Sequence, residues 1–114
     1  MEFDELSEFT KEIKKLSKKY KTLSSDLDTV KKVLRVNPKE RPPFSFKIDG
    51  LGVTSCIIKI KKIASKSFKG RGVNSGFRLI YAHFEKENRI SFIEIYHKSI
   101  KSQEDKERIK KYFK

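Results

Sequence analysis

Four side chains in the second half of the chain have the chemistry needed to act on a phosphodiester: Lys59, Lys61, Arg78 and His97. Arginine offers a planar fork of N–H groups to the non-bridging oxygens of a phosphate. Lysine stabilises the negative charge that develops in the transition state. Histidine gives or takes a proton near neutral pH. If the fold brings these four together, the sequence predicts a site for phosphoryl chemistry.

The two lysines belong to a segment that reads as a strand. In "SCIIKIKKI", Ile58 and Ile60 alternate with Lys59 and Lys61. Successive side chains of a strand point to opposite faces, so the isoleucines enter a core while the lysines form a positive strip on the other face. Lysines that only keep an edge strand soluble give the same pattern, so this signal alone does not separate the two interpretations.

Arg78 and His97 belong to two further strand-like segments, "GFRLIYAHF" and "RISFIEIYHK", joined by "EKEN". With a two-residue turn at the last two positions of this join, Ile80 faces Ile95 and Arg78 faces His97. That register matches apolar with apolar residues. A turn of three or four residues is the alternative, because the sequence lacks Asn-Gly, and a shift by one residue puts Tyr96 beside Arg78.

The glycine-rich stretch "GRGVNSGFRLIY" (70–81) invites a comparison with phosphate-binding loops. A dinucleotide fingerprint needs G-x-G-x-x-G between a strand and a helix, whereas here G-x-G-x-x-x-G leads into a strand, and no Gly-Lys-Ser/Thr step is present. We therefore interpret the glycines as the bend of a long basic loop that carries Lys66, Lys69 and Arg71. Two histidines without an acidic cluster predict no metal site, and nothing in the sequence indicates a cofactor.

The charge of the chain predicts a polyanionic partner. The formal net charge is +13, with 28 Lys and Arg against 15 Asp and Glu. Residues 1–38 are nearly balanced, with nine basic and seven acidic side chains, whereas 50–84 contain no acid and seven cations. Nucleic acid, an acidic protein and an anionic membrane are the candidate partners. A plain solvated lysine-rich face is the alternative interpretation.

Apolar periodicity predicts the remaining elements. Stripes at spacings of three and four indicate helices over 6–20 and 23–36, and their short join predicts an antiparallel hairpin. A proline-rich connection follows, with a possible short strand around Phe44–Ile48, and then the three strands above. Ser102 and Asp105 resemble a capping box that opens a C-terminal helix. The expected fold is a single α+β domain over 1–114, with a mainly antiparallel sheet of three or four strands.

Other features place the chain outside the membrane and secretory classes. Cys56 is the only cysteine, which leaves no intramolecular disulfide. The N-terminal segment is acidic and amphipathic and lacks the pattern of a signal peptide. No window approaches 18 apolar residues, so no span and no membrane partner are expected. We expect a cytoplasmic protein.

The order α-α-β-β-β-α, with "IKIKK", "GFRLIY" and "EIYHKS" on successive strands, resembles the RelE/ParE superfamily of toxin–antitoxin toxins. The resemblance covers about residue 6 to the C-terminus, and the strand-end Tyr-His is similar to that of HigB- and YoeB-like members. It implies an mRNA endoribonuclease that acts in the ribosomal A site without a cofactor. The 2′-hydroxyl attacks the neighbouring phosphate and leaves a 2′,3′-cyclic phosphate. It also implies an acidic antitoxin as partner.

The resemblance assigns roles to individual residues. Lys59 and Lys61 match the family's lysine pair, Arg78 matches its phosphate-binding arginine, and Lys98 falls where many members carry a basic residue. His97 is the expected acid–base group. Many members have a tyrosine on the C-terminal helix where this chain has Glu104, so Tyr96 or Glu104 are alternatives as general base. The residues expected to contact RNA are Lys62, Lys66, Lys69, Arg71 and Tyr96.

Two other functions remain open on the sequence. A ParE-like member would inhibit DNA gyrase by binding it and would not cleave RNA. A non-catalytic RNA-binding module is less favoured, because the lysines are not interleaved with the stacking aromatics of RRM-type readers.

Overall fold

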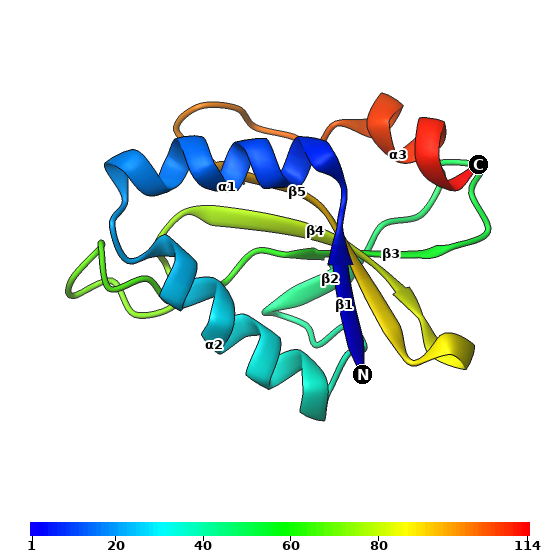
Figure 1. Cartoon of the computed structure of the whole chain (residues 1–114), viewed down its shortest axis with the longest axis horizontal. Helices are drawn as coiled ribbons and strands as arrows, with labels where there is room; N and C mark the ends of the chain where they lie inside the picture. The colour runs from blue at the N-terminus through cyan, green and yellow to red at the C-terminus, as the bar shows by residue number, and fades with distance from the viewer.

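The computed structural model describes residues 1–114 and shows three helices around a five-stranded sheet (Figure 1). The elements in chain order are β1 (Glu2–Glu5), α1 (Ser7–Lys19), α2 (Leu23–Val36), β2 (Ser45–Lys47), β3 (Cys56–Ile60), β4 (Phe77–Phe84), the 3-10 turn η1 (Glu85–Glu87), β5 (Arg89–His97) and α3 (Lys106–Phe113). The predicted α+β class and the order of the main elements are confirmed. None of the three helices is long and apolar enough to cross a membrane.

The sheet has the strand order β1-β5-β4-β3-β2 and is antiparallel except for the parallel pair of β1 and β5. The short strand expected around Phe44–Ile48 is present as β2. The expectation of three or four strands is wrong by one, because β1 was not predicted. Its sequence, "EFDE", has a single apolar residue and gives no period-two signal. Its pairing with the edge of β5 makes it a strand.

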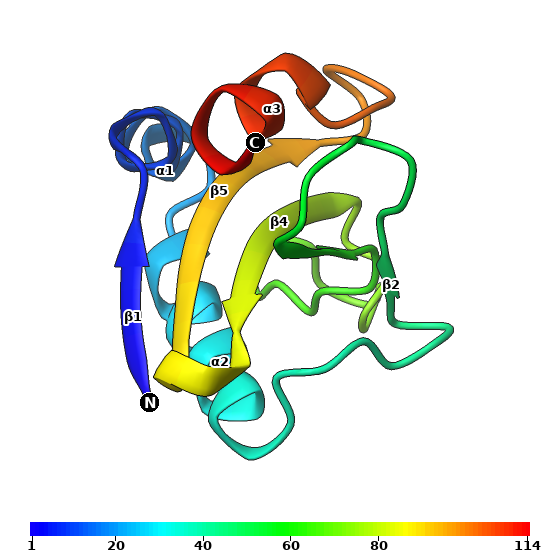
Figure 2. The same cartoon turned by 90° about the vertical axis from the view of Figure 1, so that its right-hand side faces the viewer.

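Each face of the sheet is covered by different elements (Figure 2). The hairpin of α1 and α2 covers one face, where Phe9 and Leu27 pack in one cluster with Leu79 and Phe92 of the sheet. On the opposite face, Ile109 of α3 packs in a second cluster with Leu51, Ile57, Ile80 and Ile93. Fully burying one such side chain stabilises a fold by about 1.5–3 kcal/mol, so both faces contribute to the core.

The helices follow the predicted stripes with one adjustment at the C-terminus. The first two helices lie within a residue or two of the predicted ranges. In α3, the side chain of Asp105 caps the helix by accepting a hydrogen bond from the backbone N of Arg108 at 3.0 Å. Asp105 is therefore the N-cap itself, and Ser102 lies before the helix rather than at its start.

The predicted two-residue turn of the β4–β5 hairpin and its register are wrong, and the alternative of a longer turn with Tyr96 beside Arg78 is confirmed. Four residues connect the strands, with η1 followed by Asn88 in the left-handed conformation at φ 49°. A one-residue shift then occurs between Ile80 and Tyr81, and Arg78 lies opposite Tyr96 instead of His97. Paired residues share a face. The longer turn moves the register by two residues and leaves the faces unchanged, so the one-residue irregularity is what carries His97 to the face opposite Arg78.

Candidate functional site

A pocket lined by four cationic side chains and no acidic one lies where β3 and β4 meet the loops that flank them. It measures about 280 Å³, and its lining includes Lys61, Lys62, Arg78 and Lys98, together with Phe46 and Asn74. No carboxylate compensates these charges, so the pocket favours an anion such as a phosphate. We call it the cationic pocket. Three of the predicted catalytic residues, Lys61, Arg78 and Lys98, meet here.

Backbone groups hold Arg78 in the cationic pocket. Its Nη1 donates to the carbonyl oxygens of Lys61 at 2.9 Å and of Phe77 at 3.3 Å. A guanidinium carries five N–H donors, so the rest of the fork is available to a phosphate. The Nζ of Lys61 lies 5.5 Å from the ring centroid of Phe46 on β2. Adjacent strands of the sheet therefore position the two cations together.

Gly76 brings Lys98 to the same place. Its φ is +95°, and a Cβ added there would lie 2.6 Å from Nε2 of His97 and 3.3 Å from Cε of Lys98. The backbone N of Lys98 also donates to the carbonyl of Gly76 at 2.9 Å. Only glycine accommodates both the left-handed backbone and the close approach. Gly76, which the sequence analysis interpreted as part of a bend, is thus the point where the start of β4 and the end of β5 meet.

Lys59 lies outside the cationic pocket and is paired with an acid. Its Nζ donates to Oε1 of Glu104 at 2.8 Å, and the two side chains are only 13% and 10% exposed. Burial disfavours both charges, but their hydrogen bond outweighs it. The pKa of Glu104 is therefore lowered and the pKa of Lys59 is raised. Lys59 is a charge-compensated tie between β3 and the segment before α3, which distinguishes it from Lys61.

Tyr96 is packed rather than presented to a ligand. The residue is 5% exposed, and its hydroxyl is buried without a hydrogen-bond partner. The Nζ atoms of Lys59 and Lys101 lie 5.7 Å and 5.1 Å from the centroid of its ring. A ring covered in this way is not placed to stack on an RNA base.

His97 does not join the predicted constellation with Arg78. Its Nε2 is 2.9 Å from the carbonyl oxygen of Ser75, and its Nδ1 accepts from the backbone N of Ser99 at 3.1 Å. The ring stacks at 5.2 Å on Phe68 and 6.0 Å on Tyr20. With both ring nitrogens bonded and the residue 7% exposed, the structure makes His97 the centre of an aromatic cluster.

The long basic loop between β3 and β4 is anchored at its start. Asp26 of α2 accepts hydrogen bonds from Oγ of Ser65 at 2.6 Å and from the backbone N of Lys66 at 3.3 Å. The ring of Phe68 then stacks on His97, as described above. The expected RNA-contacting side chains of this loop point to solvent and do not line the cationic pocket: Lys66, Lys69 and Arg71.

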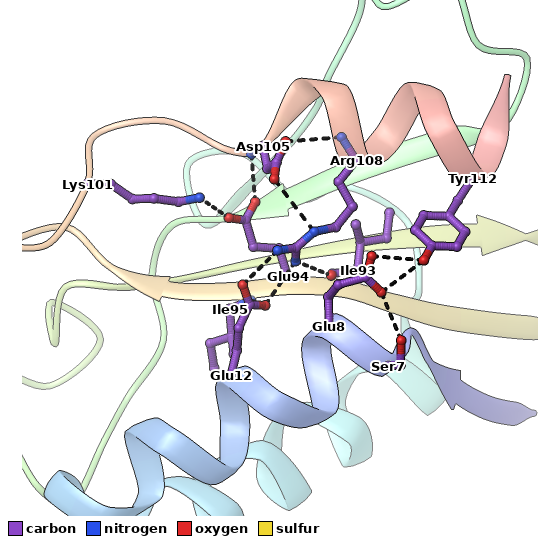
Figure 3. Close-up of polar contacts among 10 residues, drawn as sticks. All are labelled: Ser7, Glu8, Glu12, Ile93, Glu94, Ile95, Lys101, Asp105, Arg108 and Tyr112. Atoms are coloured by element: carbon purple, nitrogen blue, oxygen red, sulfur yellow. Dashed lines mark hydrogen bonds and ion pairs between the residues drawn. The ribbon is translucent and has the colours of Figure 1, made fainter.

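A network of charged side chains joins α1, β5 and α3 (Figure 3). Arg108 of α3 donates to both carboxylate oxygens of Glu12 of α1, at 3.0 Å and 2.9 Å, and to the carbonyl of Ile93 at 2.8 Å. Glu94, which is 1% exposed, accepts from the backbone N of Asp105 at 2.7 Å and pairs with Lys101. We call these side chains the interhelix network. It fixes the segment that carries Glu104.

Sequence reasoning identified the cations of the pocket but missed part of its wall and the pairing of one lysine. The oxygen Oδ1 of Asn74 accepts from Nζ of Lys62 at 3.2 Å, and Phe46 lies beneath Lys61. Neither residue has a sequence pattern that marks it. The pairing of Lys59 with Glu104 joins residues 45 positions apart. Glu104 stood out only because it occupied the place of an expected tyrosine.

The arrangement of helices and strands is that of the RelE-like fold, which confirms the predicted fold. The chain is similar to archaeal RelE in the crystal structure of the archaeal RelE–RelB complex from Pyrococcus horikoshii OT3, with a TM-score of 0.57. The two are 15% identical, and the alignment covers 84% of this chain and 92% of that chain. No family model matches the sequence, and no curated protein does. At this identity the likeness establishes the fold, and function has to be argued from the site.

Proposed function

We propose that this chain is the toxin of a type II toxin–antitoxin pair and cleaves mRNA, with the ribosome presenting the substrate. The observation that carries the proposal is the cationic pocket, an acid-free cluster of Lys61, Lys62, Arg78 and Lys98 on a RelE-like sheet. Such a pocket fits the phosphates of a nucleic-acid backbone, and in RNA each phosphate has a neighbouring 2′-hydroxyl. The neighbouring structure, a RelE–RelB complex, supports the expectation of an antitoxin partner.

The proposed reaction is an intramolecular phosphoryl transfer. The 2′-oxygen forms a bond to the adjacent phosphorus, the bond from phosphorus to the 5′-oxygen breaks, and a proton passes from the 2′-hydroxyl to solvent while the leaving 5′-oxygen gains one. Arg78 binds the non-bridging oxygens with its free N–H groups. Lys61 and Lys98 stabilise the charge that accumulates on the phosphorane. Removing one preorganised donor of this kind typically costs about 10²–10³ in rate.

The contribution of the cationic pocket is thus electrostatic, and three predicted acid–base groups lie elsewhere. His97 is held on the opposite face by Ser75 and Ser99. Tyr96 is buried, and the carboxylate of Glu104 is bound to Lys59. The proposal therefore assigns transition-state stabilisation to the arginine and lysines and gives none of these three groups a step.

Primer extension on cellular mRNA after induction of the chain tests this function. We expect new breaks in register with codons, and their loss in an Arg78→Ala variant that is verified as folded. Lys47→Ala is the matched control, because Lys47 is an exposed cation of β2 outside the pocket. Intact message in cells arrested by the wild-type chain would reject the nuclease. Accumulation of cleaved DNA in those cells would favour a gyrase inhibitor instead.

A further inference from the structure

Four rings pack together on the face of the sheet that α1 and α2 cover, opposite the face that carries Arg78. The ring of His97 stacks on Phe68 at 5.2 Å and on Tyr20 at 6.0 Å, and it lies nearly perpendicular to Phe77 at 5.2 Å. We call these four side chains the aromatic cluster. One of them, Phe68, belongs to the basic loop between β3 and β4, which Figure 1 shows beside the join of α1 and α2.

His97 also forms two directional bonds from within the aromatic cluster. Its Nδ1 accepts from the backbone N of Ser99 at 3.1 Å, so the ring proton is on Nε2 and is donated to the carbonyl oxygen of Ser75 at 2.9 Å. Ser75 precedes Gly76 in the chain, and Ser99 follows Lys98. One buried ring therefore holds the chain neighbours of two residues that line the cationic pocket.

Lys98 depends on these bonds more than the other cations of the pocket do. Its backbone N donates to the carbonyl of Gly76 at 2.9 Å, and no acid lines the pocket beside its side chain. The guanidinium of Arg78 is instead fixed by its own bonds to backbone carbonyls, and the backbone N of Lys61 is bonded to the segment before β2. Loss of the bonds at His97 should thus displace Lys98 and leave the other two cations in place.

We propose that His97 is a positioning residue of the cationic pocket. From the opposite face of the sheet, its ring connects the end of the basic loop to the turn after β5, and this connection keeps Lys98 in the pocket with Arg78. His97 itself touches neither the RNA nor the reacting atoms. The inference rests on the proposed function, because it gives His97 an effect on a lysine that would stabilise the phosphorane.

His83 is a buried histidine that lacks these connections and serves as the comparison. It is 8% exposed, close to the 7% of His97, and its neighbours in the sheet are Cys56 of β3 and Ile90 of β5. Neither neighbour lines the cationic pocket. A histidine that only fills the core contributes to stability alone, so His83→Phe is the matched control for substitutions at His97.

Two substitutions separate the stacking of His97 from its bonds. His97→Phe keeps a flat ring against Phe68 and Tyr20 but has neither bond, whereas His97→Asn loses the ring and keeps an oxygen that accepts from the backbone N of Ser99. If His97 only packs, activity follows stability and His97→Phe is the more active variant.

Positioning by His97 predicts the reverse order of the two variants. His97→Asn should be the less stable one by urea denaturation, yet it should cleave a defined mRNA in a translation extract at least about threefold faster than His97→Phe, because it keeps one of the two bonds. Both are compared under conditions in which circular dichroism shows each variant to be folded.

A double-mutant cycle shows whether His97 acts through Lys98. We expect His97→Phe to lower the cleavage rate about tenfold in the wild-type chain and less than about twofold in Lys98→Ala, because a lysine that has been removed cannot be displaced. His83→Phe should change the rate by less than about twofold in either chain.

Amide hydrogen exchange tests the same link without RNA. The amide hydrogen of Lys98 is bonded to the carbonyl of Gly76, and it should exchange with solvent at least about tenfold faster in His97→Phe than in the wild type. The amide hydrogen of Lys61, which is bonded to the carbonyl of Phe44, is the internal reference and should accelerate much less.

The proposal is overturned if His97→Phe lowers the rate by the same factor with and without Lys98, or if His97→Phe is more active than His97→Asn. It is also overturned if the amide hydrogens of Lys98 and Lys61 accelerate equally. Each of these results would make His97 a core residue only. Absence of mRNA breaks with the wild-type chain would reject the proposed function, and the exchange measurement would still decide whether His97 holds Lys98.

Discussion

The cationic pocket and the interhelix network both concentrate charged side chains, but they differ in whether the charges are paired. In the network, Arg108 binds the carboxylate of Glu12 while it is itself only 13% exposed, and buried Glu94 pairs with Lys101. In the pocket, Lys61, Arg78 and Lys98 have no acidic neighbour. Paired charges are what a fold needs when it removes ions from water, whereas unpaired ions of one sign repel each other.

This difference separates charges that stabilise the fold from charges that are available to a ligand. The surroundings of Arg108 raise its pKa, because the hydrogen bond to Glu12 and the nearby carboxylates outweigh the opposing effect of burial. Three of the five N–H groups of Arg108 are used in hydrogen bonds to Glu12 and Ile93. Only Nη1 of Arg78 is hydrogen-bonded, to the backbone carbonyls of Lys61 and Phe77. The comparison predicts that substitutions in the two regions will affect different measurements.

Removing two cations of the pocket should give the largest effect, and on activity alone. For the double variant Lys61→Ala/Lys98→Ala, we expect RNA cleavage to fall by about 10²–10³ or more, because transition-state charge is no longer stabilised. The free energy of unfolding should stay within about 0.5 kcal/mol of the wild type or rise, since like charges are removed. Cleavage of a defined mRNA in a translation extract and urea denaturation measure the two quantities.

Lys32→Ala/Lys47→Ala removes the same net charge from exposed sites outside the pocket and is the control. If this control loses as much activity, bulk charge rather than the pocket drives cleavage, and the contrast between the two regions fails.

Replacing Arg108 should lower stability, in contrast to the pocket variant, which should lower activity alone. Arg108→Met leaves the carboxylate of Glu12 and the carbonyl of Ile93 without their donor, and we expect a loss of about 3 kcal/mol in the free energy of unfolding. Lys110→Met is the matched control, because its ion pair with Glu107 is long, at 3.9 Å, and exposed. That control should change stability by less than about 0.5 kcal/mol. Similar losses in both variants, by urea denaturation, would show that burial of the network is unimportant.

The elements could be predicted from the sequence because their signals are local. Apolar spacing gave α1 and α2, alternation around Lys59 and Lys61 gave β3, and the run of branched and aromatic residues gave β4 and β5. The parallel strand β1 could not be predicted in this way, since its existence depends on pairing with β5, more than 80 residues away in the chain.

The site could be predicted only in part for a related reason. Lys61, Arg78 and Lys98 meet because each lies at or near a strand end, which the sequence indicates. The partner of Arg78 depends on the turn and on a one-residue shift in the middle of the strand pair, and neither has a sequence marker. The one-residue shift decides whether His97 lies beside Arg78 or inside the aromatic cluster.

His97→Gln tests the placement of His97 in the aromatic cluster, and we expect a smaller effect than for Arg108→Met. Glutamine loses the stacking on Phe68 and Tyr20 and cannot reproduce both bonds of the ring, so we expect a stability loss of about 1–2 kcal/mol. The pH dependence of cleavage by the variant should parallel that of the wild type. His83→Gln, at another buried histidine, is the comparison. A loss of the acidic limb of the pH profile in His97→Gln alone would restore the histidine to the chemistry.

Glu104→Gln should give the smallest effect, one that depends on pH. Glutamine keeps an oxygen that accepts from Lys59 but removes the charge, so near neutral pH we expect a loss of about 1 kcal/mol. The pKa of the Glu104 carboxyl is lowered in the folded chain, with the bond from Lys59 overcoming the effect of burial. The stability that the charge contributes is therefore present above the unfolded pKa of roughly 4.3 and is lost as the pH falls through the folded value.

The pKa of Lys59 is raised in the folded chain. The stability that its charge contributes is therefore present below the unfolded pKa of roughly 10.4 and is lost as the pH rises through the folded value. Urea denaturation of the wild type and of Glu104→Gln at a series of pH values measures the difference in their unfolding free energies. This difference should be constant from about pH 5 to 10 and shrink below pH 4. A difference that persists at low pH would mean that Glu104 acts through packing. The charge of the ion pair between Lys59 and Glu104 would then not be what stabilises this contact.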